Sequence, residues 1–262
     1  MMPILSRPIV WIVAVALAFS GHAFAQTTAP PSASPPTFAI LSLVGDQFDL
    51  VTKREEIGSR IDPNSHRNIP FDSAALDDIA LAAAESVIKR LKPVSPVVRF
   101  SIRDPRLFAL QDKLLVDSGE SRDMRGALAK LLREHQATRL VLVTKWRDDA
   151  QFKMYSGTTG TGKISGLGFY VDPYQRLRML GSGEETNGFL AAFAYLKVSI
   201  VDVASMAVVR SVQGRESQMS PPLHATGAVR AWDALTPEGK VEALDRVLRA
   251  AVESATTAAL AD

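Results

Sequence analysis

Two short and almost wholly apolar runs constrain the fold of this chain most: Phe38–Val44 (FAILSLV) and Leu140–Thr144 (LVLVT). A β-strand that is covered on both faces carries apolar residues in succession, whereas a strand with one solvated face alternates. Both runs therefore predict strands with layers above and below them. The chain also carries helical apolar stripes, such as the one from Leu76 to Leu91, and this combination favours helices packed on a sheet.

The remaining apolar patterns complete an α/β order along the chain. Further strands are predicted at Phe48–Val51 (a second strand or a continuation of the first), at Val97–Ile102, and in a hairpin of Phe189–Val203 with Val208–Val212; helices are predicted at 72–91, 105–116 and 121–135 and from Thr236 onward. The polar stretch Lys53–Pro70 is predicted to be a loop. This order predicts one α/β domain over residues 38–262, built on a single mixed sheet packed by helices.

The closing helix has the clearest start of all these elements. Thr236 is followed by Pro237, which places proline at the first helical position. Its predicted buried stripe consists of Val241, Leu244, Leu248, Ala251 and Ala255.

Residues 151–188 interrupt this order with a segment rich in glycine and tyrosine. Short strands at Phe152–Tyr155 and Leu167–Val171 are predicted to form a hairpin insertion there. Aromatic and basic side chains on such a segment are typical of a surface that binds a partner protein. The candidate contact residues are Tyr155, Lys163, Phe169, Tyr170, Tyr174, Arg176 and Arg178. Packing of the same rings beneath the hairpin is the alternative.

The sequence offers few groups that could catalyse a reaction or hold a cofactor. It contains no cysteine, which excludes a thiol nucleophile, a disulfide and a cysteine metal site. Gly157–Lys163 (GTTGTGK) is close to a phosphate-binding loop, but Ile164 stands where a hydroxyl for Mg²⁺ is required. Gly166 and Gly168 would also break the helix that must follow such a loop. We therefore interpret the motif as a glycine-rich turn, and we predict no cofactor and no metal.

One acidic pair, Asp148-Asp149, follows a buried strand, where the catalytic carboxylates of α/β sheets often lie. Neighbouring residues do not share a face of a strand or helix, which is poor geometry for joint acid–base work. Beyond Ala25 the histidines are His66, His135 and His224, and none has a second histidine at metal-ligand spacing. A hydrolase or small-ligand-binding protein that uses these carboxylates is the alternative hypothesis, and it predicts a pocket on which they converge.

The N-terminal segment Met1–Ala25 predicts export. Arg7 is its only charged residue, the apolar run Ile9–Phe19 follows, and Ala23 and Ala25 supply the small residues of a signal-peptidase site. We expect cleavage after Ala25 and a periplasmic or secreted protein. An uncleaved anchor is disfavoured because the apolar run is shorter than the roughly 20 residues that span a bilayer. Residues 26–37 are rich in proline, serine and threonine and are predicted to be a linker.

Three segments carry a family resemblance: 131–143 (LLREHQATRLVLV), 196–210 (LKVSIVDVASMAVVR) and the closing helix from Thr236. Together they resemble the periplasmic domains of the curli secretion-channel type and the N-terminal domain of the Tol-Pal translocation protein. The resemblance implies a sandwich similar to an anticodon-binding domain. It also implies a non-enzymatic role in envelope assembly, scaffolding or activation of a partner, and it transfers no site residues.

These observations predict an exported, non-enzymatic envelope protein that acts through protein–protein contacts. The formal net charge of +2 is too small to indicate a nucleic-acid partner. The expected partner is another envelope protein, and no transmembrane segment is expected after signal cleavage. Assembly of the chain into a homo-oligomeric ring or channel is a further hypothesis.

Overall fold

The structure is a computed structural model, and it describes residues 34–55, 64–71, 74–116, 119–154, 157–178, 185–220 and 230–261. Its strands are β1 (Phe38–Leu43), β2 (Gln47–Thr52), β3 (Ser65–Pro70), β4 (Val97–Phe100), β5 (Arg139–Lys145), β6 (Arg147–Asp149), β7 (Phe152–Met154), β8 (Gly157–Thr159), β9 (Lys163–Arg178), β10 (Glu185–Asp202) and β11 (Ala207–Ser220). Its helices are α1 (Ala75–Leu91), α2 (Pro105–Ala109), α3 (Arg122–Glu134), the 3₁₀ turn η1 (Ala231–Ala234) and α4 (Pro237–Leu260). The predicted signal peptide and most of the predicted linker lie outside the described residues.

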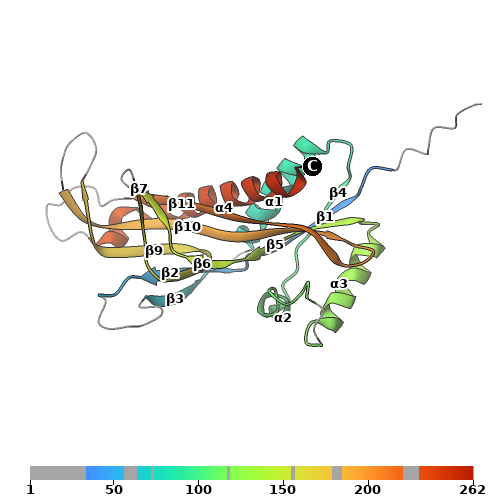
Figure 1. Ribbon diagram of the computed structural model, residues 1–262, viewed down its shortest axis with the longest axis horizontal. Coiled ribbons are helices and arrows are strands. Elements are labelled where there is room, and N and C mark those ends of the chain that lie inside the picture. The colour runs from blue at the N-terminus through green and yellow to red at the C-terminus, as the bar shows by residue number, and fades with distance from the viewer. Residues whose placement is uncertain are drawn as a thin grey trace, which may run out of the picture. The chain divides into compact units, whose positions relative to one another are not determined.

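The longest strand, β10, is the spine of a nine-stranded mixed sheet (Figure 1). Along one side it pairs with β11. Along the other side Glu185–Tyr195 pairs with β9 and Leu196–Asp202 pairs with β5, so β9 and β5 lie end to end. The sheet continues from β9 to β2 and β3, and from β5 to β1 and β4. It therefore has two halves, which we call the β1 wing (β5, β1, β4) and the β2 wing (β9, β2, β3).

The short segment Val44–Asp46 between β1 and β2 joins the two wings. β1 is parallel to β5 and β2 is parallel to β9, so β2 continues in the direction of β1. Gly45 lies in this segment with φ = +89°, a conformation that glycine adopts without steric cost. The backbone can therefore turn from one wing into the other within a few residues.

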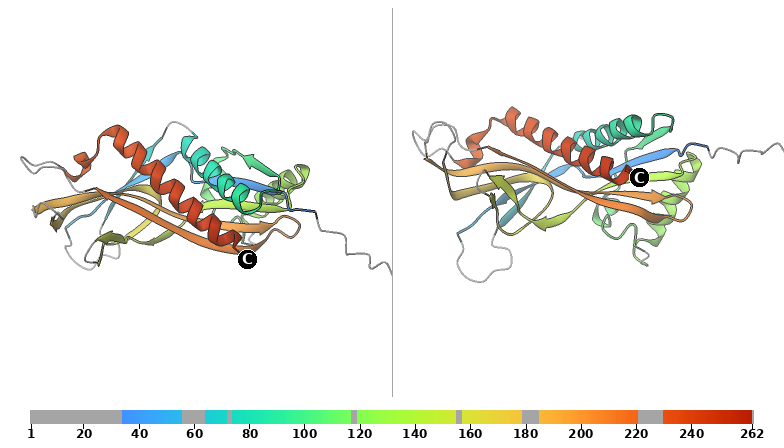
Figure 2. Two further views of the ribbon diagram at one scale, coloured as in Figure 1. Left: turned by 90° about the horizontal axis from the view of Figure 1, so that it is seen from above. Right: turned by 45° about the horizontal axis from the view of Figure 1, so that its top comes forward.

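Helices cover both faces of the β1 wing (Figures 1 and 2). Phe38 and Ile40 of β1 point into a core shared with α1 and α4, whereas Leu41 and Leu43 point into a second core with α2 and α3. The double coverage predicted from the apolar run of β1 is confirmed. The predicted fold class, an α/β fold with a single mixed sheet packed by helices, is confirmed as well.

The β7–β8 hairpin packs over the β2 wing. Phe152 of β7 is fully buried, and its ring contacts those of Tyr170 and Phe189, with centroid separations of 4.7 and 5.9 Å. A third core cluster therefore lies beneath this hairpin, on the face of the sheet opposite to α1 and α4.

The closing helix α4 begins as its sequence predicts. The Thr236 hydroxyl accepts a hydrogen bond from the Gly239 amide at 3.1 Å, and Pro237 is the first helical residue. Four of the five stripe residues are buried, but Val241 is 52% exposed and its assignment to the core was wrong. No helix within the described residues has the length and the apolar composition that a membrane span requires.

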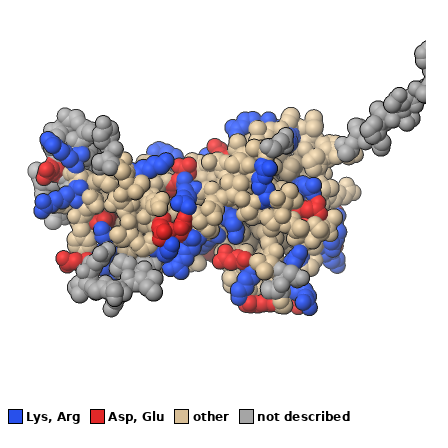
Figure 3. Space-filling model, viewed as in Figure 1, with Lys and Arg blue, Asp and Glu red and all other residues tan. Residues whose placement is uncertain are grey.

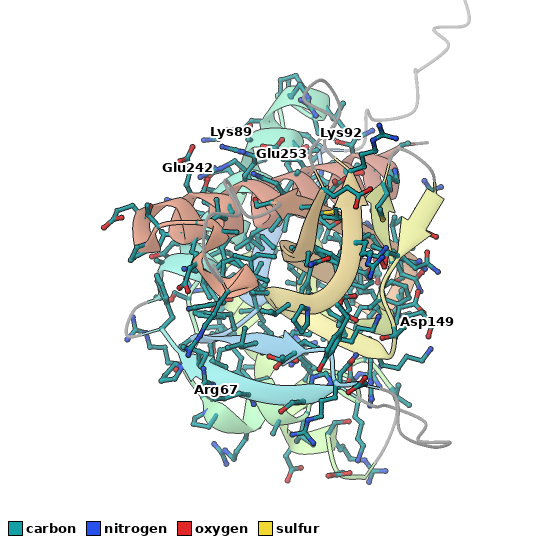
Figure 4. All side chains as sticks on the ribbon, turned by 90° about the vertical axis from the view of Figure 1, so that its left-hand side faces the viewer. Arg67, Lys89, Lys92, Asp149, Glu242 and Glu253 are labelled. Carbon is teal, nitrogen blue, oxygen red and sulfur yellow. The ribbon has the colours of Figure 1, made fainter. Side chains whose placement is uncertain are left out.

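An additional strand, β3, lies in the stretch that was predicted to be a loop. It pairs antiparallel with β2 at the edge of the sheet, where Arg67 is labelled in Figure 4. Most of its side chains are exposed or half-buried, so it lacks the apolar alternation by which strands are recognised. The loop prediction for residues 65–70 was therefore wrong.

Residues 151–188, which were predicted to be a hairpin insertion, are arranged differently in the structure. β9 is one strand of 16 residues inserted between β2 and β10, so most of residues 163–178 belong to the main sheet. A separate two-stranded hairpin forms only from β7 and β8, and a glycine turn then leads into β9. Within the GTTGTGK motif, residues 160–162 form the predicted turn, whereas Gly157–Thr159 are strand β8, and a strand and no helix follows the motif.

Candidate ligand-binding site

A cavity of about 530 Å³ opens at the carboxyl end of β1, where the two wings meet. β4 follows α1 on one face of the sheet, β5 follows α2 and α3 on the other face, and these two strands flank β1. Such a topological switch point leaves a crevice beyond the strand ends, and ligands of open α/β sheets bind in crevices of this kind. The cavity is lined by the β1–β2 segment, the start of α1, the segment from β4 through α2 and the end of β5.

Asp77, in the first turn of α1, lines the cavity and is bonded to the end of β1. Its Oδ1 accepts hydrogen bonds from the Ser42 hydroxyl at 2.5 Å, from the Val44 amide at 3.0 Å and from the Gly45 amide at 3.2 Å. Asp77 is only 9% exposed, and burial raises the pKa of its carboxyl, while these hydrogen bonds and the charge of Lys145 act in the opposite direction. One side chain thus ties the end of β1 to α1.

Lys145, the last residue of β5, reaches into the cavity from the opposite side. Its stem lies over Gly166, where a Cβ atom would stand 2.8 Å from Cδ, and its Nζ would be 3.9 Å from a Cβ at Gly45. The side chain is half-buried, and burial lowers the pKa of its ammonium, whereas the carboxylates of Asp77, Asp46 and Asp49 raise it. A cation is therefore held here in a partly dehydrated position.

The segment of α2 is attached to the end of β5 through one amide side chain. Gln111 Oε1 accepts a hydrogen bond from the Lys145 backbone amide at 2.8 Å, and Gln111 Nε2 donates to the Phe108 carbonyl at 3.0 Å. This places the Phe108 ring next to Gly45, at 3.5 Å from the position of a Cβ there. Phe108 and Phe71 give the cavity aromatic walls, and Arg103 lies at its exposed rim.

The structure does not bring the seven predicted contact residues together. Tyr155 lies outside the described residues. Phe169 and Tyr170 are buried on opposite faces of β9, Phe169 toward α4 and Tyr170 beneath the β7–β8 hairpin, so neither ring reaches the surface. Phe169 and Tyr170 are therefore core residues, and Tyr170 packs beneath the hairpin as the alternative predicts.

The exposed members of that set lie at two ends of β9. Lys163 begins the strand and forms an ion pair with Asp149 at 2.6 Å. Tyr174, Arg176 and Arg178 are exposed near its other end, about 36 to 50 Å from Lys163 at the usual rise of a strand. Because side chains alternate along a strand, these last three share one face and form the only part of the predicted contact surface that stays together among the described residues.

The acidic pair Asp148-Asp149 forms no converging site. Asp148 forms an ion pair with Arg215 of β11, Asp149 pairs with Lys163, and neither lines the cavity. Acidic and basic side chains gather over β6 in Figure 3, and Asp149 lies at the periphery in Figure 4. The prediction that these two carboxylates converge on a pocket was wrong, because adjacent strand residues point to opposite sides.

Two of the histidines have structural partners. His135 is the C-terminal cap of α3, with its ring edge-to-face to Phe100 at 5.1 Å, as expected for a helix-end residue. His66 lies on β3 with Nδ1 2.7 Å from Asp49 Oδ2, although its sequence context predicted a solvated loop. Within the described residues, no group of three or more histidine or carboxylate side chains is arranged to hold a metal ion.

Comparison with known proteins gives only distant similarities. No protein-family model matches the sequence, and no curated protein is similar to it at a significant level. Among solved structures, the PelC dodecamer from Paraburkholderia phytofirmans is 12% identical over 90% of this chain and 96% of that chain, with a TM-score of 0.32. A Helicobacter pylori homolog of a neuraminyllactose-binding hemagglutinin is 8% identical over 87% of this chain and 89% of that chain, with a TM-score of 0.41. Similarities this distant assign neither a function nor a partner to this chain.

Sequence reasoning missed the cavity, although two signals were present. Gly45 and Asp46 directly follow the first apolar run, and Lys145 directly follows the second. The rule that functional groups lie at the carboxyl ends of such strands was applied to Asp148-Asp149, slightly too far along the chain. Asp77 gave no such signal, because its role depends on the folding of α1 against the end of β1.

Proposed function

We propose that this chain is an exported, non-enzymatic binding protein of the cell envelope and that a small molecule occupies the cavity at the end of β1. The observation that carries the proposal is the cavity itself, whose volume of about 530 Å³ lies at a topological switch point. Cavities of roughly 300–1,000 Å³ are typical of small-molecule sites. Export is supported by the sequence of Met1–Ala25.

Binding without catalysis is favoured by the arrangement of the lining side chains. A nucleophile needs a base within about 2.6–3.2 Å. The hydroxyl of Ser101 lines the cavity, but within the described residues it forms no hydrogen bond with Lys145 or Asp77. Asp77 already accepts three hydrogen bonds through one oxygen, which suits a structural role.

The test is to recover the bound molecule. The exported protein is incubated with a small-molecule extract of envelopes and examined by native mass spectrometry. Ala109→Trp places a large ring in the cavity lining, and Ala127→Trp, on the exposed face of α3, is the matched control. We expect an adduct with the wild-type protein and with Ala127→Trp but not with Ala109→Trp. No adduct, or an adduct that survives in Ala109→Trp, would contradict the proposal.

A second candidate function, contact with an envelope protein, is favoured by the free edge of β11. Within the described residues β11 pairs only with β10, and Val208 and Val209 are 43% and 60% exposed. The Arg210 guanidinium is bonded to the Ala261 carbonyl at the end of α4, and Arg215 further along β11 pairs with Asp148. An exposed strand edge can accept an extended segment of a partner as a further strand. Assembly, scaffolding or partner activation, as the curli and Tol-Pal resemblance implies, would act through this contact.

Photo-crosslinking in intact cells distinguishes this contact from non-specific collision. A crosslinker at Val209 is compared with one at Val241, which is exposed on α4 away from the edge. We expect a specific protein adduct from position 209 only. Equal adducts from both positions, or none from either, would count against a partner at β11.

A further inference from the structure

Two basic side chains line the cavity, the half-buried Lys145 and the exposed Arg103. Neither the Lys145 ammonium nor the Arg103 guanidinium forms a hydrogen bond or ion pair with any residue in the described part of the chain. The Lys145 stem runs over Gly166 toward Gly45, so its ammonium is directed into the cavity. Lys145 is half-buried and is attracted by Asp46, Asp49 and Asp77 without an ion-pair contact, and a charge held away from water is normally paired. A negatively charged group from outside the chain would complete this site.

The carboxylates near Lys145 differ in whether they are already engaged. Asp77 is bonded to the end of β1, and Asp49 is 2.7 Å from a ring nitrogen of His66. Asp46 lines the cavity at its rim, and within the described residues its side chain forms no hydrogen bond or ion pair. The cavity thus presents two positive charges and one negative charge that make no ion-pair contact within the described residues, although Asp46 attracts Lys145.

The walls between these charges are apolar. Phe71 and Phe108 face the cavity from two sides, and Pro105 contributes a further apolar surface. A ligand that fills this space has an apolar body, and it carries charges of both signs to match Lys145, Arg103 and Asp46.

We propose that the cavity binds a free α-amino acid with an apolar side chain. Its carboxylate pairs with Lys145 and Arg103, its ammonium pairs with Asp46, and its side chain lies against Phe71 and Phe108. The inference rests on the proposed function, since it names the ligand class of the same cavity. A ligand with a single charge would leave one of these protein charges without a partner. The site is therefore expected to bind a zwitterionic ligand more tightly than a singly charged one.

Three related probes test the proposal by calorimetry with the exported protein. L-phenylalanine carries both charges, 3-phenylpropanoate lacks the ammonium, and phenethylamine lacks the carboxylate. We expect L-phenylalanine to bind at least tenfold more tightly than either singly charged probe. Binding of a singly charged probe as tight as that of L-phenylalanine would overturn the proposal.

Variants assign each charge of the ligand to a side chain. Lys145→Met is expected to weaken the binding of L-phenylalanine and 3-phenylpropanoate at least tenfold but not to weaken the binding of phenethylamine. Asp46→Asn is expected to weaken the binding of L-phenylalanine and phenethylamine but not to weaken the binding of 3-phenylpropanoate. Lys153→Met removes an exposed lysine of β7 that does not line the cavity, and it serves as the control. Equal effects of a variant on all three probes would indicate a general structural role and would contradict the assignment.

Failure of this inference can be told apart from failure of the proposed function. If none of the probes binds but native mass spectrometry still finds an adduct that Ala109→Trp removes, the cavity is a ligand site and the amino-acid assignment is wrong. If neither experiment finds a ligand, both proposals fail. Should Lys145→Met not fold, the ranking of the three probes on the wild-type protein decides the question alone.

Discussion

At the scale of single residues, the cavity contains charges whose positions oppose folding. Burial lowers the pKa of the Lys145 ammonium, so the folded state binds this proton less tightly than the unfolded state does. Burial raises the pKa of the Asp77 carboxyl, so the folded state binds this proton more tightly than the unfolded state does. Groups that are retained at the expense of stability are typical of functional sites, and each can be tested by substitution.

Replacement of Lys145 by methionine is expected to stabilise the protein near neutral pH. Because folding lowers this pKa, the charged lysine disfavours the folded state at pH values below its folded pKa. The disadvantage shrinks as pH rises toward the ordinary lysine value of 10.5. Urea unfolding of both proteins at pH 7 and pH 10 measures the difference. A Lys145→Met variant less stable than wild type at pH 7 would mean that the attraction of Asp46, Asp49 and Asp77 exceeds the cost of burial.

Asp77 allows a comparison of two substitutions at one position. Asp77→Ala leaves the Ser42 hydroxyl and the Val44 and Gly45 amides without their acceptor, which is expected to cost about 1–3 kcal/mol or more. Asp77→Asn keeps an acceptor oxygen and removes the buried charge. Because folding raises this pKa, the wild-type protein loses stability relative to Asp77→Asn as pH rises from below 3.8 through the folded value. Denaturant unfolding at pH 3.5 and pH 7 measures the free energies of unfolding of wild type and Asp77→Asn. An advantage of Asp77→Asn that shrinks as pH rises would contradict this expectation.

At the scale of elements, apolar periodicity predicted the buried strands and the long helices but not the elements that lack it. β1, β5 and α4 carry unambiguous patterns, since each buries a continuous face. β3 is a polar edge strand that is defined only by its backbone pairing with β2. β9 was mistaken for an insertion because its glycines resemble turn residues in the sequence. In the structure a Cβ at Gly168 would lie 2.0 Å from the Asp49 carbonyl oxygen, so that glycine permits the close approach of β2 to β9.

Gly168→Ala is therefore expected to destabilise the β2 wing. The added Cβ would collide with the Asp49 backbone and would also lie 2.8 Å from the Phe193 ring. Overpacking of this kind costs roughly 1–3 kcal/mol and more where backbone has to move. Gly126→Ala is the control, because no atom lies within 4 Å of its Cβ position and Gly126 is exposed in α3. There the higher helix propensity of alanine is expected to add about 0.5–1 kcal/mol. Thermal unfolding of both variants measures the change in stability relative to wild type. Changes of the same sign for Gly168→Ala and Gly126→Ala would contradict this account.

At the scale of the whole molecule, the candidate site results from how the two wings are joined. No segment of the chain contains it, since its residues come from the β1–β2 segment, the start of α1, the end of β5 and the α2 region. Apolar patterns could indicate that β1 and β5 are buried, but not that their carboxyl ends lie beside the start of α1. The amino-acid sequence therefore allowed the fold class to be predicted, whereas the cavity depended on the order in which helices alternate between the faces of the sheet.

The remaining prediction for the whole chain concerns its export, on which the envelope function depends. Met1–Ala25 combines one basic residue, an apolar run and a small-residue exit, and signal peptidase is expected to cleave after Ala25. Intact-mass and N-terminal analysis of the protein from an envelope fraction should therefore find a chain that begins at Gln26. Ala23→Arg puts a large charged side chain into the cleavage site and should leave the precursor uncut, whereas Ala33→Arg, in the predicted linker, should not. A mature protein that retains Arg7, or one recovered only from the cytoplasm, would contradict the prediction and remove the basis for a role in the envelope. Ligand binding in the cavity would still be open to the calorimetric test.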